Sequence, residues 1–287
     1  MGEERQSGAT PNEPRARDAV ADRMLDVAVA QIEAEGLRVG VDQIRMEQVI
    51  EAAGVSRASA YRRWPSREAF LADVLVATVR RTSLLPETEE DLSRLVALVR
   101  SVGADVLGTE QGRRDLVVEG LRLASDADIR RTLSSSRWRT HLALTATHAG
   151  LPAGRVQDAV GQALLEADGV MTARRAAVYA NLCDLIGYRL VPPASGEEGF
   201  RRLAATTGLM MAGIVLRTIP SAGWLDDRQE AVLFGASRPA PWSQAERSLV
   251  GVLLAHLEPD PDQAWDGATI EARLATFFEQ VDDLLAP

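Results

Sequence analysis

Apolar residues recur along most of the chain at spacings of three and four, which is the period of an α-helix with one buried face. The first such segment stops at Gly36 and contains Val20, Met24, Val27, Ala28 and Ile32. Similar segments follow to the end of the chain, separated by clusters of Gly, Pro, Ser or Asp. No segment shows the alternation of a half-buried strand bounded by turns. The pattern therefore predicts an all-α fold.

The periodic segments predict helices over 16–35, 44–53, 56–63, 66–82, 88–107, 112–124, 126–149, 153–168, 172–190, 198–217, 243–258 and 269–285. Several begin with a residue that can accept a hydrogen bond from the first turn, namely Ser56, Ser66, Thr88 and Thr172. Ser243 and Glu246 have the spacing of a capping box. The proline-containing stretch 218–242 is predicted to be a loop, and residues 1–14 a disordered tail.

The most informative stretch is 46–70, where two short helices meet at a tight turn. Gly54 supplies the left-handed conformation that ends the first helix, and Ser56 caps the second. Val55 lies between them as an apolar plug, while small residues before Gly54 let the two helices approach closely. Two short helices joined in this way form a helix-turn-helix.

The second of these helices has two distinct faces. Ala60 and Trp64, four residues apart, are predicted to pack inward with Val55. Ala58 and Arg62 lie on the opposite face, where a small side chain lets the helix enter a major groove. Ser59 lies beside Ala58 and Arg62 on that face. Arg57 and Arg62 are suited to contact base edges or phosphates. Tyr61 and Arg67 flank the face and are suited to contact phosphate oxygens.

The net charge of the chain and the local charge of the helix-turn-helix point in opposite directions on DNA binding. The 287 residues include 32 basic and 41 acidic ones, for a net charge of −9, which argues against a nucleic-acid partner. Residues 55–67, however, hold four Arg and no acid, so that this segment carries +4 and the rest of the chain −13. One basic surface on an acidic chain is compatible with DNA. The alternative is a generic helical hairpin whose arginines are simply solvated.

All 32 basic residues are Arg, which we attribute to codon bias in a GC-rich genome.

Composition excludes other classes. The single Cys183 allows neither an internal disulfide nor a Cys-rich zinc site. The apolar stretch 203–216 is too short to span a bilayer, and residues 1–17 lack the apolar core of a secretory signal. We therefore expect a cytoplasmic protein with no membrane partner.

Residues 23–75, and above all 52–70 (AAGVSRASAYRRWPSREAF), resemble the TetR family of bacterial transcriptional regulators. The resemblance implies a three-helix DNA-binding domain over 15–65, then a helical domain over 66–287 that binds ligand and dimerises. It also implies the following DNA-binding residues: Arg45, Ser56, Arg57, Ala58, Ser59, Tyr61, Arg62 and Arg67.

Three positions depart from the family pattern. The connection after Gly36 is longer than usual, and Arg45 stands where a capping Thr or Ser is common. Ala60 replaces a larger aliphatic residue, and Trp64 is expected to fill the lost volume. The chain also continues after residue 240 with two further apolar helices.

The remainder of the chain carries no catalytic constellation, so no enzyme activity, cofactor or metal site is predicted. His141 and His148 could share a helix face, but two His without a third ligand are more typical of a helix surface or core. A largely apolar effector pocket is predicted from Trp138, Leu142, Met171, Tyr179, Cys183 and Met210, with Met211 beside them. The alternative is that these residues are simply core or dimer interface.

For dimerisation, helices 172–190 and 198–217 are the best candidates, because two from each subunit would make a four-helix interface. The second was expected to expose Leu203, Met210, Met211, Ile214 and Val215. The sequence thus predicts a homodimeric repressor released from double-stranded operator DNA by a small molecule. The alternatives are an architectural DNA-binding protein and a helical enzyme or carrier with a vestigial DNA-binding domain.

Overall fold

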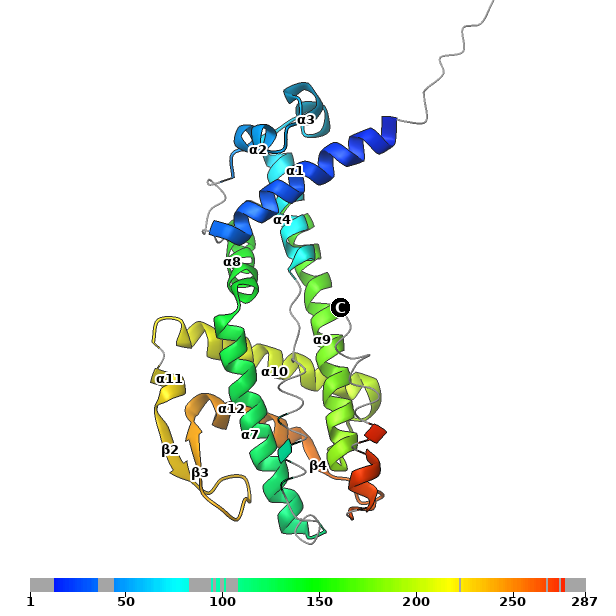
Figure 1. Ribbon diagram of the computed structural model, residues 1–287, viewed down its shortest axis with the longest axis vertical. Coiled ribbons are helices and arrows are strands. Elements are labelled where there is room, and N and C mark those ends of the chain that lie inside the picture. The colour runs from blue at the N-terminus through cyan, green and yellow to red at the C-terminus, as the bar shows by residue number, and fades with distance from the viewer. Residues whose placement is uncertain are drawn as a thin grey trace, which may run out of the picture. The chain divides into compact units, whose positions relative to one another are not determined.

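The computed structural model describes residues 13–35, 44–82, 108–221, 223–266, 268–273 and 275–276, together with Arg94, Ala97, Leu98 and Ser101. The chain divides into two compact units (Figure 1). Unit 1 comprises residues 1–83 and 136–167, and unit 2 comprises 84–135 and 168–287. The boundary expected after residue 65, between a DNA-binding domain and a regulatory domain, stays a prediction. Residues 1–12 of the expected tail 1–14, almost all of the expected helix 88–107 and residues 277–285 of the expected helix 269–285 lie outside the described residues. The last two residues expected in the tail, 13 and 14, instead begin α1.

Unit 1 is built from helices. They are α1 (Glu13–Glu35), α2 (Met46–Ala52), α3 (Arg57–Arg63), α4 (Arg67–Arg81), α8 (Ser136–Gly150) and the first part of α9 (Arg155–Ile186). The four N-terminal helices lie within three residues of their predicted limits. Ser66 caps α4 by accepting a hydrogen bond from the Ala69 amide, as its position in the sequence predicts.

Two apolar clusters hold unit 1 together. In the first, α1 contributes Met24 and Ile32, which pack with α2, α3 and the first turns of α4. In the second, Leu75 and Val79 from the later part of α4 pack against α8 and the first part of α9. Helix α4 is therefore buried along its length, first by the helix-turn-helix and then by α8 and α9. An ion pair of 2.7 Å between Arg81 and Asp26 adds a contact to α1.

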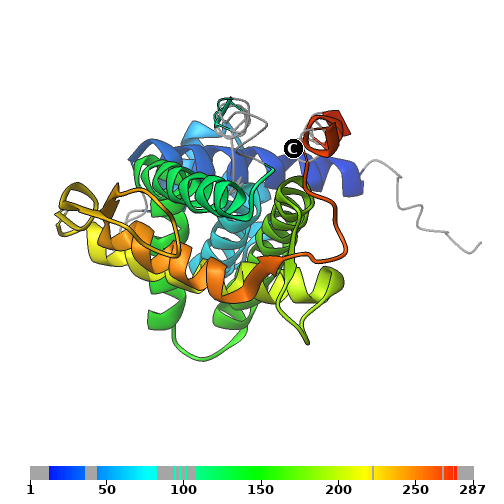
Figure 2. The ribbon, with the colours of Figure 1, turned by 90° about the horizontal axis from the view of Figure 1, so that it is seen from below.

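Unit 2 contains helices and two small sheets. Its elements are α7 (Glu110–Ser134), the last part of α9, β1 (Tyr188–Leu190), α10 (Gly196–Thr218), α11 (Gly223–Asp226), β2 (Arg228–Ala231), β3 (Ala240–Ser243), α12 (Gln244–His256) and β4 (Leu257–Pro259). Helix α12 packs against both α7 and α10 (Figures 1 and 2). Its capping box, predicted from Ser243 and Glu246, is confirmed by both hydrogen bonds.

The sequence predicted no strands and a loop over 218–242, and both predictions were wrong. Strand β1 pairs antiparallel with β4, and β2 pairs antiparallel with β3 to form a hairpin. Each strand has only three or four residues, which is too short for alternation to be distinguished from a turn. The segment 223–226 forms the short helix α11.

Three predicted helix limits were also wrong. The break expected near residue 125 lies at Ser135, and Ser125 is buried inside α7. The two helices expected over 153–168 and 172–190 form the single helix α9, so Thr172 caps nothing. Polar and glycine residues at these points favour helix ends locally, but packing of the neighbouring turns overrides such weak preferences. Helix α9 then ends at Ile186, followed by β1 rather than by further helix.

The all-α prediction is confirmed, because helices dominate both units and the strands are small. None of the helices in the described part of the chain combines the length and hydropathy needed to cross a membrane.

Candidate nucleic-acid interface

The turn between α2 and α3 has the geometry that the sequence predicts. Gly54 adopts φ +62°, a conformation that side chains with a Cβ rarely take, and ends α2. The Ser56 hydroxyl accepts a hydrogen bond of 3.1 Å from the Ser59 amide, which caps α3. The same hydroxyl donates to the Ser59 hydroxyl across 2.9 Å. The first turn of α3 is thus fixed by its own side chains.

The inward face of α3 is confirmed. Ala60 is 0% exposed and Trp64, its C-cap residue, is 1% exposed, and Val55 packs partly buried against the same cluster. The Trp64 ring meets Phe70 edge-on, with centroids 5.1 Å apart. Ala60 and Trp64 belong to the same apolar cluster, and whether the indole fills the volume of a larger aliphatic residue at position 60 stays a prediction.

Helix α3 is fixed to α4 by Asp73. The Trp64 indole donates from Nε1 to Asp73 across 2.8 Å, and Arg63 forms an ion pair of 3.0 Å with the same carboxylate oxygen. The Arg63 guanidinium also lies 5.0 Å from the centre of the Trp64 ring. Of the four arginines in the basic segment, Arg63 is therefore engaged in holding the fold.

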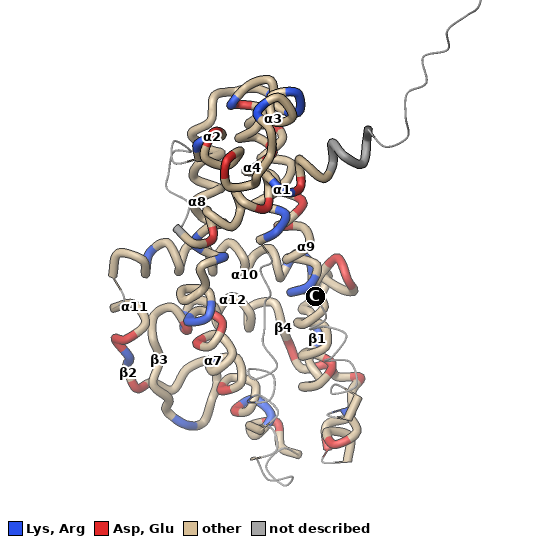
Figure 3. The backbone as a smooth tube through the Cα atoms, turned by 45° about the horizontal axis from the view of Figure 1, so that its top comes forward, with Lys and Arg blue, Asp and Glu red and all other residues tan. Residues whose placement is uncertain are grey.

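The opposite face of α3 is open to solvent. Arg57, Ala58 and Arg62 are exposed, and Ser59 is half-buried beside them. Among the described residues, neither Arg57 nor Arg62 has a hydrogen-bond or ion-pair partner. Figure 3 shows the basic residues gathered on α3. The two unpaired guanidinium groups are chemically suited to base edges and phosphates. The small side chains between them would let the backbone of α3 come close enough to a groove for the base edges to be reached.

Tyr61 flanks this face and has a partner that the sequence analysis missed. Its hydroxyl, on a side chain 43% exposed, donates to Glu47 Oε1 in α2 across 3.1 Å. Hydrogen bonds from the Glu47 backbone amide and from Tyr61 lower the pKa of Glu47, and the same contact raises the pKa of Tyr61. Glu47 therefore orients Tyr61, whose oxygen still has lone pairs but whose proton is already donated.

The two remaining arginines lie at helix starts. Arg45 is exposed at the N-cap of α2 and makes no side-chain cap hydrogen bond, so it does not replace a capping Thr or Ser. Arg67 is the exposed first residue of α4. Their contacts with DNA stay predictions. The sequence signal for Asp73 was weak: it is an acid six residues after α4 begins at Arg67.

The predicted effector residues are divided between the units. Trp138 and Leu142 belong to α8 in unit 1, whereas Met171, Tyr179, Cys183 and Met210 belong to unit 2. Tyr179 and Cys183 line a common cavity of unit 2, which is mostly apolar and has a volume of about 60 Å³. Tyr179 also donates a hydrogen bond of 2.9 Å to Thr207 on α10. A role in effector binding stays a prediction for all six.

The predicted apolar surface of α10 was on the wrong face. Most of the expected residues are buried within the chain, namely Leu203, Met211, Ile214 and Val215, and Met210 is half-buried. The exposed apolar residues of α10 are instead Leu209, Leu216 and Ile219. Apolar residues occur on both faces of α10, so the sequence alone does not show which face is buried. The packing of α10 against the rest of the chain decides this.

Comparison with known proteins agrees with this geometry. Residues 25–74 match the family model described as bacterial regulatory proteins, tetR family. The matched range begins within α1, includes all of α2 and α3, and ends within α4. No curated protein and no solved structure matches the chain. The matched domain supports a DNA-binding transcriptional regulator.

Proposed function

Since residues 25–74 belong to the TetR family of bacterial regulatory proteins, we propose that the chain is a homodimeric repressor that a small molecule releases from its operator. The observation that carries the proposal is the exposed face of α3, on which Arg57 and Arg62 have no partner among the described residues. A fold that keeps two guanidinium groups unpaired on one face leaves them available for an external anion.

In this proposal α3 enters the major groove of the operator. Ala58 and Ser59 let its backbone approach, and Arg62 contacts a base edge or a phosphate. Arg45 and Arg67, at the starts of α2 and α4, contact phosphates on either side. The acidic remainder of the chain repels DNA, which limits binding outside the basic surface. A chromosomal partner also implies action in the cytoplasm.

The second copy is proposed to pack on α10. Leu209 is 78% exposed, and Leu216, two turns later, is 57% exposed. Between them Gly213 is also exposed and has no Cβ to prevent close approach of another helix. A solvent-exposed apolar stripe of this kind is typical of a subunit interface. Two subunits would then place two copies of α3 on a pseudo-palindromic site.

Release by an effector requires that the effector bind two conformations with different affinity. Helix α4 is suited to transmit such a difference, because it is tied to α3 through Asp73 and packs on α9 through Leu75 and Val79. Helix α9 has its first part in unit 1 and its last part in unit 2. A shift of α9 caused in unit 2 would therefore reach α4.

Footprinting on the DNA upstream of the chain's own gene tests the proposal. We expect protection of one short pseudo-palindromic site, with at least about a hundredfold preference over random duplex at the same salt concentration. Equal affinity for both duplexes would favour the architectural alternative. No binding to either would favour the helical enzyme or carrier and contradict the proposal.

A further inference from the structure

Unit 2 contains a larger cavity that none of the predicted effector residues lines. Its volume is about 350 Å³, and it is lined by the first half of α7, by the β2–β3 hairpin and by Leu98. The apolar part of its lining includes Leu116, Val118, Ala236, Pro239, Ala240 and Trp242. A volume of this size and a mostly apolar lining are typical of small-molecule sites.

Three of the four charged side chains in the lining already have partners. The Asp115 carboxylate accepts hydrogen bonds from the Ser237 amide at 2.7 Å, from the Ser237 hydroxyl, and from Gln111 at 2.8 Å. Burial of Asp115 opposes ionisation, but these hydrogen bonds outweigh it and lower the pKa of Asp115. The positive charge of Arg238 lowers the pKa of Asp115 further, so Asp115 is an ionised part of the wall whose oxygens already have hydrogen-bond donors.

Glu119 and Arg122 satisfy each other in the same wall. Arg122 donates from Nε and Nη2 to the two carboxylate oxygens of Glu119, at 2.8 Å and 2.6 Å. Its Nη1 donates to the carbonyl of Pro241 across 3.3 Å, so all three guanidinium nitrogens are engaged. Neither residue offers a strong site for a charged ligand.

Arg238 is the exception. Its side chain lines the cavity and is exposed, and within the described residues it has neither a hydrogen bond nor an ion pair. Arg238 therefore acts on Asp115 only through its charge and leaves the N–H groups of its guanidinium available, and such a group binds carboxylates and other anions in a bidentate manner.

We propose that this cavity binds a small, largely apolar molecule with one anionic group, whose apolar body lies against Trp242 and Val118 and whose anion binds Arg238. Its role as the effector site rests on the proposed function. The binding itself does not depend on that function, because the cavity and its charge belong to unit 2 alone.

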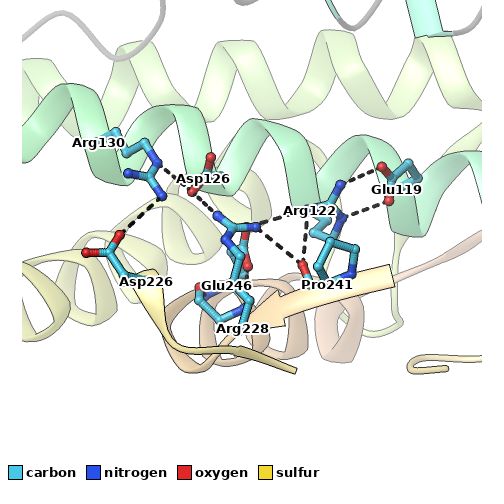
Figure 4. A network of polar contacts seen from close by, with 9 residues as sticks. Glu119, Arg122, Asp126, Arg130, Asp226, Arg228, Pro241 and Glu246 are labelled. Carbon is cyan, nitrogen blue, oxygen red and sulfur yellow. Dashed lines mark hydrogen bonds and ion pairs between the residues drawn. The ribbon is translucent and has the colours of Figure 1, made fainter. Parts of the chain in front are cut away.

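The cavity wall is connected to the interior of unit 2 by a chain of ion pairs (Figure 4). Arg122 lies 3.7 Å from Glu246 of α12, which pairs with Arg228 of β2 across 3.0 Å. Arg228 in turn donates to Asp126 of α7 across 2.6 Å. A molecule bound against the β2–β3 hairpin therefore contacts a hairpin that is joined by ion pairs to both α7 and α12. Its binding can in this way affect the positions of these two helices.

The test uses a matched pair of fluorescent probes with the full chain. Anilinonaphthalene sulfonate carries an aromatic body and one anion, and N-phenylnaphthylamine has the same body without charge. We expect saturable binding of the sulfonate with one site per chain. Arg238→Gln should weaken sulfonate binding about tenfold and change binding of the uncharged probe less than twofold. The matched control Arg202→Gln, an exposed arginine of α10, should change neither.

Two further variants test the position of the site. Ala236→Trp places an indole in the cavity and should weaken both probes at least tenfold, whereas Val232→Trp, on the exposed hairpin outside the lining, should not. Unchanged binding in Ala236→Trp, or equal losses in Arg238→Gln and Arg202→Gln, would overturn the proposal. Duplex binding is measured separately, so a chain that binds the probes but no DNA would contradict the proposed function and leave this site standing.

Discussion

The Trp64 indole donates a hydrogen bond to Asp73 across 2.8 Å and thereby joins the end of α3 to α4. Trp64 is almost fully buried, so its Nε1 has no access to water as an alternative acceptor. Helices α3 and α4 are therefore joined by this carboxylate as well as by their shared apolar cluster. Any movement of α4 then also moves α3.

Removing this acceptor should destabilise the first unit. We expect Asp73→Ala to lower the free energy of unfolding by about 1–3 kcal/mol, because it leaves a buried donor without a partner. Asp73→Asn keeps an oxygen acceptor and loses only the half-exposed ion pair with Arg63, so it should cost less than about 1 kcal/mol. Urea unfolding followed by Trp fluorescence distinguishes the two. Equal midpoints for Asp73→Ala and the wild type would show that the bond is not needed.

The exposed stripe of α10 should govern dimerisation. We expect the double variant Leu209→Arg and Leu216→Arg to be monomeric at concentrations at which the wild type is a dimer, because four buried charges per interface would be uncompensated. Sedimentation velocity measures the change. The control Val232→Arg alters another exposed apolar residue and should remain dimeric. A dimeric double variant would exclude this face as the interface.

Cys183 should be inert in the folded chain. Burial raises the pKa of its thiol to about 12, so the thiolate that reacts with disulfide reagents is scarce at neutral pH. Because the folded pKa lies above the unfolded value, the thiol contributes stability below about pH 8.5 that is lost as the pH rises toward 12. We expect no reaction with Ellman's reagent at pH 8 until urea is added. Rapid reaction without urea would contradict the burial.

The ion pair between Arg228 and Glu246 should be needed for the stability of the second unit. Glu246 is 0% exposed, so Arg228→Met leaves a buried carboxylate with the Ser243 amide as a donor but, among the described residues, with only the more distant Arg122 as a cation, and we expect a loss of about 3 kcal/mol. The double variant with Glu246→Met should recover only part of this loss, because it removes the buried charge but also the capping hydrogen bond from the Ser243 amide. Arg130→Met, whose pairs are more exposed, should cost less than about 1 kcal/mol. Urea unfolding is the measurement, and a larger loss in Arg130→Met than in Arg228→Met would contradict the account.

The sequence predicted the helix-turn-helix in detail because its determinants are local. A positive φ at Gly54, a cap at Ser56 and the inward side of α3 each follow from residues within one or two turns. The partners of Tyr61 and Trp64 could not be predicted in the same way. Glu47 and Asp73 come from neighbouring helices, and only the packing angle between those helices brings their carboxylates within hydrogen-bonding distance.

The second unit was less predictable for a related reason. Helix α9 continues through Gly169 and Thr172, where local preference favours a stop, since packing along the helix outweighs it. The covered face of α10 and the cavity beneath the hairpin both depend on contacts between distant segments. For the same reason the residues expected to line a pocket, such as Trp138 and Met171, were chosen by chemical type; neither lines the two cavities described above, and their role stays a prediction.

Binding of one duplex by three chains tests the central claim most directly. The duplex is the site recovered by footprinting, and fluorescence anisotropy at one fixed salt concentration compares the wild type, Arg62→Ala and Arg202→Ala. We expect Arg62→Ala to weaken binding by about 1–3 kcal/mol and Arg202→Ala to bind like the wild type. Unchanged affinity in Arg62→Ala, or equal losses in both variants, would contradict recognition of DNA by the exposed face of α3.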